Sequence, residues 1–289
     1  MIRPARPEDL PGIKRLWMQA FHDSEAATDF YFEHRMPLAD LLDCLLIDTR
    51  DGELRGMLSL LPIDLISGGV GYPARYFFAI ATDERFRRMG ISTALIGEAE
   101  RITMERGGVA SLLVPANPPL FDFYGKRGYE TMFSYEPAIF EGAGIADCPG
   151  GARLLPAEPE DILRLRDAAF SKSRLYVRWD EEALGFVIKA SRAWDAPLLR
   201  FTLDGGEGYA YCERDGSAVI IKELALSGIG VPDAMRIVHR ELHADSYHVR
   251  LAGDDAAAET RPYGMIRWLK KPLTLSPEGP APYLGLGKD

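Results

Sequence analysis

The sequence predicts an α/β protein of two tandem domains of one type, each a mixed, mostly antiparallel sheet with helices on both faces. Strand-like and helix-like patterns alternate along the 289 residues, which leaves room for two domains of roughly 150 residues. The stretch "IRPARPEDL" (Ile2–Leu10) recurs as "LLPAEPEDI" (Leu154–Ile162), and each copy leads into a helical pattern that ends in Ala-Phe. Two unrelated strand–turn–helix starts would also look alike, but we favour two copies of one domain.

Periodicity predicts the elements of the first copy in order. Apolar residues at helical spacing mark the helices, and apolar runs bounded by turn residues mark the strands. We expect a strand Ile2–Pro4, a helix from Pro7 to Phe21, a helical patch near Asp29–Arg35, strands Leu42–Asp48 and Leu54–Ile66 joined by the turn Arg50–Glu53, a strand Tyr72–Thr82, a helix ending near Glu105, a strand Val109–Val114, a helix near Leu120–Lys126 and a closing strand from Tyr129.

A Gly-rich stretch, "FEGAGIADCPGGA" (Phe140–Ala152), separates the two copies and reads as a linker. The predicted division is a first domain over residues 1–142, a linker over 143–152 and a second, degenerate domain over 153–289.

The composition limits which binding partners and which cellular location we expect. The formal net charge of −9 argues against nucleic acid and favours a cationic substrate. Cys44, Cys148 and Cys212 are odd in number and far apart, so we expect neither disulfides nor a metal site. The start "MIRPARPEDL" has no signal-peptide run, and no stretch reaches the apolar length of a membrane span. We therefore expect a cytoplasmic protein with no membrane partner, and a homo-oligomer is compatible with the sequence.

The stretch "DERFRRMGISTAL" (Asp83–Leu95) places three arginines before a predicted helix. Positive charge is unfavourable at a helix N-terminus unless an anion lies there. Gly90 allows a close approach of the backbone, the N–H groups of the first helical turn are free, and arginine forks match phosphate oxygens. The loop is neither a Walker loop nor a Rossmann fingerprint, because it lacks their further residues. An ordinary loop with solvated arginines is the alternative.

Two motifs carry a family resemblance. "ATDERFRRMGISTALIGEAE" resembles motif A of the GNAT acyltransferase superfamily, with Arg87, Gly90 and Ser92 at its defined positions. Ser92 departs from the usual Gly or Ala but is still small. "VPANPPLFDFYGKRGYE" resembles motif B, whose places are filled by Asn117, Tyr124, Gly128 and Tyr129. The first half also resembles bacterial tandem-GNAT proteins of the enhanced-intracellular-survival type, without their sterol-carrier-like domain.

The resemblance implies an acetyl-CoA-dependent N-acetyltransferase that uses no metal. It implies that acetyl-CoA binds where the strands Tyr72–Thr82 and Val109–Val114 part, with the backbone of Ile80, Ala81 and Thr82 against the pantetheine. The pyrophosphate would lie on the loop of Arg87, Arg88, Met89, Gly90, Ile91 and Ser92.

The same resemblance makes Tyr124 the general acid for the departing thiolate and Asn117 a partner of the pantetheine arm. Tyr124 could instead be a packing aromatic, and Asn117 a turn former before Pro118.

The sequence does not single out one residue as the general base. Its candidates are Asp23, Glu25, Asp29, Glu33, His34 and Glu136. The second copy lacks an arginine before the helix in "LALSGIGVPDAM" (Leu224–Met235) and lacks a motif B, which argues against a second active site. The terminal carboxylate of Asp289 is a weak candidate, because the related proteins that use theirs are longer.

Two classes of function remain. The first is an N-acetyltransferase acting on a small or peptidic amine, which the acidic residues of the 23–33 region predict to be cationic. The second is a non-catalytic acyl-CoA sensor, whose second half would report binding. The presence of Tyr124 favours the enzyme.

Overall fold

The computed structural model describes residues 1–36, 40–253, 259–275 and 278–286. The helices are α1 (Leu10–Phe21), α2 (Glu25–His34), α3 (Leu41–Cys44), α4 (Ile91–Glu105), α5 (Pro118–Gly125), α6 (Pro159–Phe170), α7 (Glu181–Ala193) and α8 (Val231–Glu241). The strands are β1 (Ile2–Pro4), β2 (Leu45–Arg50), β3 (Glu53–Ser67), β4 (Val70–Thr82), β5 (Ala110–Leu113), β6 (Glu130–Glu141), β7 (Arg153–Leu155), β8 (Tyr176–Arg178), β9 (Leu198–Leu203), β10 (Gly206–Asp215), β11 (Ala218–Ser227), β12 (Ser246–Ala252) and β13 (Arg261–Trp268).

The predicted α/β class with mixed sheets is confirmed. The first residues of one helix and one strand differ from the predicted ones. Helix α2 begins at Glu25 rather than near Asp29, because the Ser24 hydroxyl caps it by accepting a hydrogen bond from the Ala27 N–H at 3.2 Å. The strand expected from Leu42 begins at Leu45, since residues 41–44 form the short helix α3.

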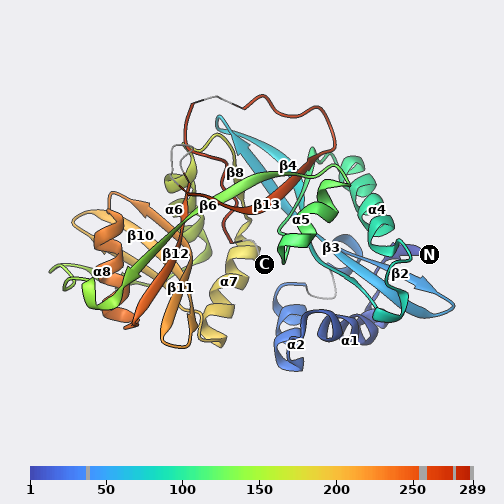
Figure 1. Ribbon diagram of the computed structural model, residues 1–289, viewed down its shortest axis with the longest axis horizontal. Coiled ribbons are helices and arrows are strands. Elements are labelled where there is room, and N and C mark those ends of the chain that lie inside the picture. The colour runs from blue at the N-terminus through green and yellow to red at the C-terminus, as the bar shows by residue number, and fades with distance from the viewer. Residues whose placement is uncertain (37–39, 254–258, 276–277, 287–289) are drawn as a thin grey trace.

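The two halves repeat one strand order. The described residues form one sheet of 13 strands, in the order β1-β2-β3-β4-β5-β13-β6-β12-β11-β10-β9-β7, with β8 beside β3. Both halves are mostly antiparallel, and each holds one parallel pair, β4–β5 or β11–β12, joined through a helix. The halves are therefore two copies of one topology, arranged about the centre of the sheet (Figure 1).

The halves exchange their last strands. We expected the strand after Tyr129 to close the first sheet, but β13, from the end of the chain, lies between β5 and β6. Strand β6 in turn pairs with β12 of the second half. Figure 1 shows β6 and β13 side by side between the two halves. The expectation was wrong because an apolar strand pattern specifies faces, not which edge accepts the strand.

Burial holds β13 in this position. Met265 packs into the apolar cluster under α4, and the next residue, Ile266, packs into the cluster on the opposite face with α1. Their exposed fractions are 3% and 0%, and fully burying such side chains contributes about 1.5–3 kcal/mol each.

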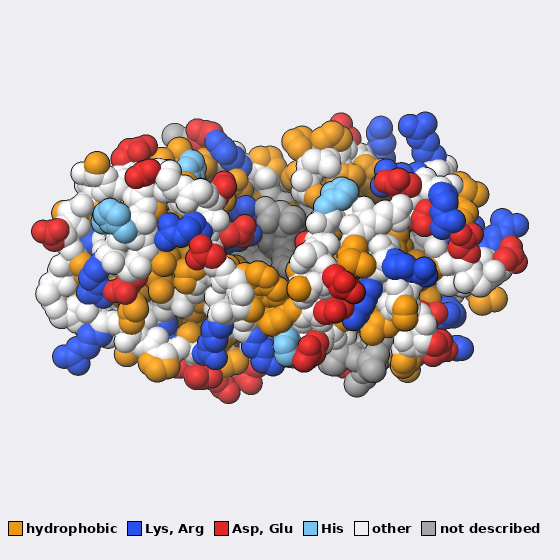
Figure 2. Space-filling model, turned by 90° about the horizontal axis from the view of Figure 1, so that it is seen from below, with side chains coloured by type: hydrophobic (Ala, Val, Ile, Leu, Met, Phe, Trp, Pro, Cys, Tyr) orange, Lys and Arg blue, Asp and Glu red, His pale blue; other side chains and the backbone are white. Residues whose placement is uncertain are grey.

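Helices cover both faces of the first half's sheet. The buried side of α4, including Leu95 and Ala99, packs on one face, and Ile13, Leu16 and Trp17 of α1 pack on the other. Figure 2 shows the halves as two lobes with a hollow between them and with basic and acidic side chains interspersed. No helix of the described residues has the length and apolar character needed to cross a bilayer.

Candidate active site

A cleft opens where the parallel strands β4 and β5 part. They pair only at Arg75–Ser111 and Tyr76–Leu112. Beyond Tyr76, β4 continues to Thr82 with β3 on its other edge, while β5 ends at Leu113. Within the described chain, the β5-side edge of β4 from residue 77 to 82 therefore has no strand partner. Such an edge can hydrogen-bond an extended ligand as an added strand would.

A bulge in β4 lies at the start of this free edge. The pairing with β3 shifts between Met57–Ala81 and Ser59–Phe78, which leaves Ala79 and Ile80 opposite one residue. Ala79 has a φ of 51°, an unfavourable value for a residue with a side chain. Bulges re-aim the backbone next to binding sites. Of the predicted contact residues, Ile80 belongs to the bulge, and Ala81 and Thr82 follow directly after it.

The loop after β4 ends in an open helix N-terminus. Arg88 and Gly90 have φ values of 65° and 79°, and α4 begins at Ile91 without a capping side chain. In the described part of the chain, the backbone N–H groups of residues 88–93 meet no acceptor. Free N–H groups at the positive end of a helix form an anion site. The structure thus brings Arg88, Met89, Gly90, Ile91 and Ser92 together as one N–H-lined turn.

The three arginines of the loop are not equivalent. Arg85 is committed to Asp83 and Glu53, donating to Asp83 Oδ2 at 2.8 Å and Glu53 Oε1 at 2.5 Å. These bonds raise the pKa of its guanidinium further. Arg87 lies 3.5 Å from the exposed Glu84, and Arg88 has no ion-pair partner among the described residues. The cations free for an anionic ligand are therefore Arg87 and Arg88.

Arg127 adds a cation that we did not predict. Its Nη2 and Nε donate to Thr93 Oγ1, in the first turn of α4, at 2.7 and 3.1 Å. Its Nη1 donates to the Phe123 carbonyl at 2.6 Å, and the guanidinium lies over the Phe123 ring. The sequence signal was a basic residue just after the motif B helix, but only the packing of α5 on α4 brings it to the loop.

Tyr124 lies on α5 within the apolar cluster of Phe77, Leu113 and Ile91, beside the point where the strands part. It is 7% exposed, and its hydroxyl makes no hydrogen bond among the described residues. Burial raises the pKa of Tyr124 to about 12, although the nearby charge of Arg127 acts in the opposite direction. The phenol therefore carries its proton at neutral pH.

Asn117 is exposed at the start of α5, before two prolines. Its backbone carbonyl accepts from Leu120 N–H at 3.1 Å, but its side chain does not cap the helix. The amide is therefore available to a ligand.

A buried polar network joins α4 to β5 and β13 beneath the cleft. The Glu100 carboxylate, on α4, accepts from the Tyr129 hydroxyl at 3.2 Å and from Arg267 Nη1 at 2.9 Å. The Tyr129 hydroxyl also lies 2.8 Å from Ser111 Oγ on β5. Burial raises the pKa of Glu100 despite the charge of Arg267. Arg267 belongs to β13, so sequence reasoning restricted to the first half missed it.

The candidate bases are spread over the other face of the sheet. Asp23 accepts from Trp17 Nε1 at 2.7 Å, and the Trp17 ring packs edge-on against Phe78 of β4 at 5.7 Å. Asp29 is paired with Lys14 at 2.7 Å, and His34 packs on Phe30. The structure therefore connects Asp23 to the cleft more directly than the other candidates.

The remaining base candidates lack such a connection. Glu25 begins α2, Glu33 is exposed, and Glu136 lies on β6 opposite Leu251. Asp289 lies outside the described residues.

The second half carries a buried ion pair on the counterpart of β4. Arg166 and Glu223 are both fully buried and joined by a bond of 2.8 Å between Nε and Oε1. The Tyr283 hydroxyl donates to Glu223 at 3.0 Å, and Tyr209 donates to the same carboxylate. Glu223 lies on β11, the counterpart of β4, and Arg166 lies on α6, which takes the place of α1 in the second copy.

Two splayed parallel strands, a bulged β4 and an open helix N-terminus define the acyltransferase class of α/β domain. Residues 1–132, a little under half of the chain, match the family model described as an acetyltransferase (GNAT) domain. No curated protein matches the sequence.

Solved structures share the fold of both halves. A GCN5-related N-acetyltransferase from Anabaena variabilis has a TM-score of 0.74 and 18% identity, covering 93% of this chain and 73% of its own. A probable N-acyltransferase from Enterococcus faecalis has a TM-score of 0.72 and 17% identity, with coverages of 93% and 72%. Eis1 from Mycobacterium abscessus has a TM-score of 0.68 and 18% identity, with coverages of 93% and 74%.

Proposed function

We propose that the first half binds acetyl-CoA and transfers its acetyl group to a primary amine by direct attack. The observation that carries the proposal is a continuous arrangement: the free edge of β4 leads into the open N-terminus of α4, and the protonated Tyr124 lies beside the same cleft. The edge suits the pantetheine amides, and the N-terminus with Arg87 and Arg88 suits the pyrophosphate.

The chain's residues have distinct roles in this proposal. A backbone N–H at Ile80–Thr82 stabilises the negative charge that develops on the thioester oxygen. The amine nitrogen forms a bond to the carbonyl carbon, and the bond from that carbon to sulfur breaks. Tyr124 donates its proton to the departing thiolate, and Asp23, directly or through water, accepts the proton that the amine loses. Asn117 binds the pantetheine arm.

The acceptor is proposed to be a cationic amine, such as a polyamine or a lysine side chain. Support comes from the net charge of −9 and from Asp23 on the face opposite α4, where the acceptor would enter. A carboxylate beside the attack site would attract the ammonium form and then assist its deprotonation.

A sensor is the second candidate, favoured by the strand exchange. Strand β13, from the second half, pairs with β5. A ligand that binds between β4 and β5 could therefore change the positions of strands from both halves. The sensor would bind acetyl-CoA without turning it over.

One experiment on the full chain separates these functions. Calorimetry with acetyl-CoA measures binding, and a thiol-release assay against a panel of amines measures transfer. The enzyme predicts one site per chain and release of one thiol per acetylated amine. Binding without release would support the sensor, and absence of binding would overturn both.

A further inference from the structure

A second cavity lies between the two halves. Its main chamber has a volume of about 600 Å³, and a neighbouring chamber of about 490 Å³ shares Pro62, Arg75, Arg106 and Glu182 with it. The cavity opens along an interrupted edge of β3: β2 pairs up to Ser59, and β8 pairs from Asp64 onward. In the part of the chain that the structure describes, residues 60–63 have no strand partner on that edge.

The cavity is separate from the acetyl-CoA cleft. Arg106 follows the C-terminal end of α4, whereas the open loop is at its N-terminal end. A helix of 15 residues spans about 22 Å. The side chain of Arg75 also points away from the acceptor face, since Tyr76 packs on the side of α1, and neighbouring residues of a strand point to opposite faces. Arg75 therefore points toward the α4 side.

Three arginines line one side of the cavity together with Asp40 and Asp43, and two of these arginines have unused donors. The half-buried guanidinium of Arg75 makes no hydrogen bond or ion pair with the described residues. Arg35 is only 7% exposed, and its Nη2 is enclosed without a hydrogen-bond partner. Its nearest counter-charge is Glu182, at 3.6 Å. A buried charged donor without a partner is unfavourable, so a ligand oxygen at this wall would relieve a cost that the free protein carries.

The third arginine of this wall is held in place. Arg106 donates to the Asp43 carbonyl at 2.8 Å and to Asp43 Oδ1 at 2.9 Å. It contributes positive charge near Arg75 from a fixed position, and the proximity of the two guanidiniums favours an anionic group between them.

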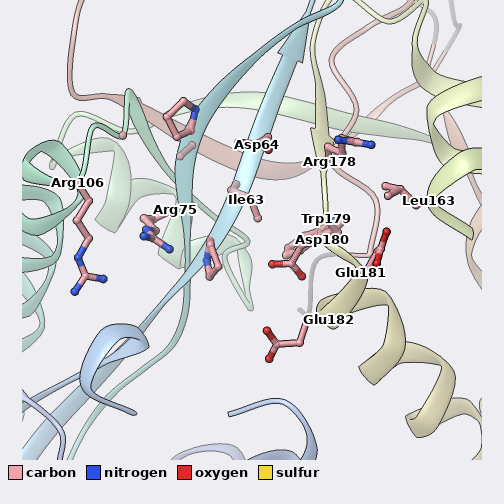
Figure 3. Close-up of a pocket in the computed structure, with 14 residues that line it drawn as sticks. Ile63, Asp64, Arg75, Arg106, Leu163, Arg178, Trp179, Asp180, Glu181 and Glu182 are labelled. Atoms are coloured by element: carbon pink, nitrogen blue, oxygen red, sulfur yellow. The ribbon is translucent and has the colours of Figure 1, made fainter. Parts of the chain in front are cut away.

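The opposite wall is acidic. Asp180, Glu181 and Glu182 stand at the first turn of α7, and Figure 3 shows them across the cavity from Arg75 and Arg106. Acidic residues there also favour the helix dipole, and Asp180 caps the helix by accepting from Ala183 N–H at 2.8 Å. Burial raises the pKa of Glu182, with smaller contributions from Asp40 and Asp180, although the charge of Arg35 acts in the opposite direction.

We propose that this cavity binds a small zwitterion of the α-amino-acid class, with its carboxylate on Arg75 and Arg35 and its ammonium on the acids of α7. A plain anion would meet the carboxylates of α7, and a plain cation would meet the arginines, so only a ligand with both charges satisfies both walls. The apolar lining, which includes Ile63, Leu163 and Trp179, accommodates the ligand's side chain. The volume lies within the range of small-molecule sites.

The test measures binding to the full chain and needs no turnover, so it stands apart from the acetyl-transfer proposal. The standard L-amino acids are screened by thermal shift, and the best is titrated by calorimetry beside its carboxamide and its N-acetyl derivative. We expect one site per chain, with both derivatives binding at least tenfold more weakly. Equal binding of either derivative, a site for acetate that is as strong, or no response from any amino acid would overturn the proposal.

Variants locate the site. Arg75→Met and Glu182→Gln should each weaken the best amino acid at least tenfold. Arg75→Met should leave the melting temperature unchanged, because this guanidinium is only half buried, whereas Glu182→Gln should lower it slightly, because it removes the counter-charge of the buried Arg35. Arg101→Met, on the exposed side of α4, is the matched control and should leave affinity unchanged. Unchanged affinity in both cavity variants would place the ligand elsewhere and sink the proposal.

Discussion

Arg267 Nη1, on the exchanged strand β13, lies 2.9 Å from the carboxylate of Glu100 on α4. Glu100 also accepts from Tyr129, which follows the helix of Tyr124. The last strand of the chain therefore holds the helix whose N-terminus forms the proposed phosphate site. A residue from the second half completes the core of the first.

Replacing Arg267 by Met should lower the free energy of unfolding by about 1–3 kcal/mol, the cost of leaving a buried polar group without its partner. The lower part of that range applies because Arg267 itself is 39% exposed. Urea denaturation measures the change. Arg261→Met, on the same strand but 60% exposed, is the control and should have little effect. If both variants lost equal stability, the Glu100 contact would not be the cause.

Arg88→Glu should weaken acetyl-CoA binding about tenfold to a hundredfold, since a charge-assisted bond of about 1.5–3 kcal/mol is replaced by repulsion. Calorimetry with acetyl-CoA and with an acetyl-pantetheine that lacks phosphate gives the comparison, and only the first ligand should lose affinity. Arg85→Gln is the matched control, because Asp83 and Glu53 already hold that guanidinium. Equal losses for both ligands would assign Arg88 to folding.

Tyr124→Phe should lower kcat about a hundredfold to ten-thousandfold, the usual contribution of a general acid. The KM for acetyl-CoA should change little, because the hydroxyl acts as the thiolate leaves. Steady-state kinetics with the best amine measures both constants. Full activity of the Phe variant would leave Tyr124 as a packing residue only.

The pH dependence follows from burial of the same phenol. Its pKa is raised to about 12, so Tyr124 keeps its proton, and its capacity as an acid, up to that pH. The stability contributed by the neutral buried ring is likewise complete below the unfolded pKa of about 10 and is lost as pH rises through 12. The kcat profile of the native chain should therefore show no alkaline fall below about pH 10. A fall near pH 9 that disappears in Tyr124→Phe would show that the phenol loses its proton at a lower pH, and would contradict the raised pKa.

The cationic acceptor predicts a salt effect. The kcat/KM for the best amine should fall as ionic strength rises, because screening weakens attraction between the acidic chain and the ammonium. Asp23→Asn should reduce the rate and flatten the salt dependence, whereas Asp29→Asn, whose carboxylate is already paired with Lys14, should leave both nearly unchanged. A flat salt profile in the native chain, or a neutral best acceptor, would reject the idea.

The sequence by itself determined the features that depend on neighbouring residues. The arginine loop, Gly90 and the helix after it form a local unit whose backbone geometry follows from the order of residues. The repeat predicted two copies of one topology, and the strand order of the two halves shows them. Features of this kind depend on residues that are close together in the sequence, so a sequence motif is enough to predict them.

Only the tertiary structure decided which distant segments meet. The sequence pattern of β13 predicts a strand with two apolar faces, but it does not predict that this strand pairs with β5. Arg267 reaches Glu100, Arg127 reaches Thr93, and Arg35 lies across from Glu182 only after the halves pack. Edge pairing and cavities are set by the joint fit of surfaces from remote parts of the chain, and that fit is a property of the fold rather than of any single stretch.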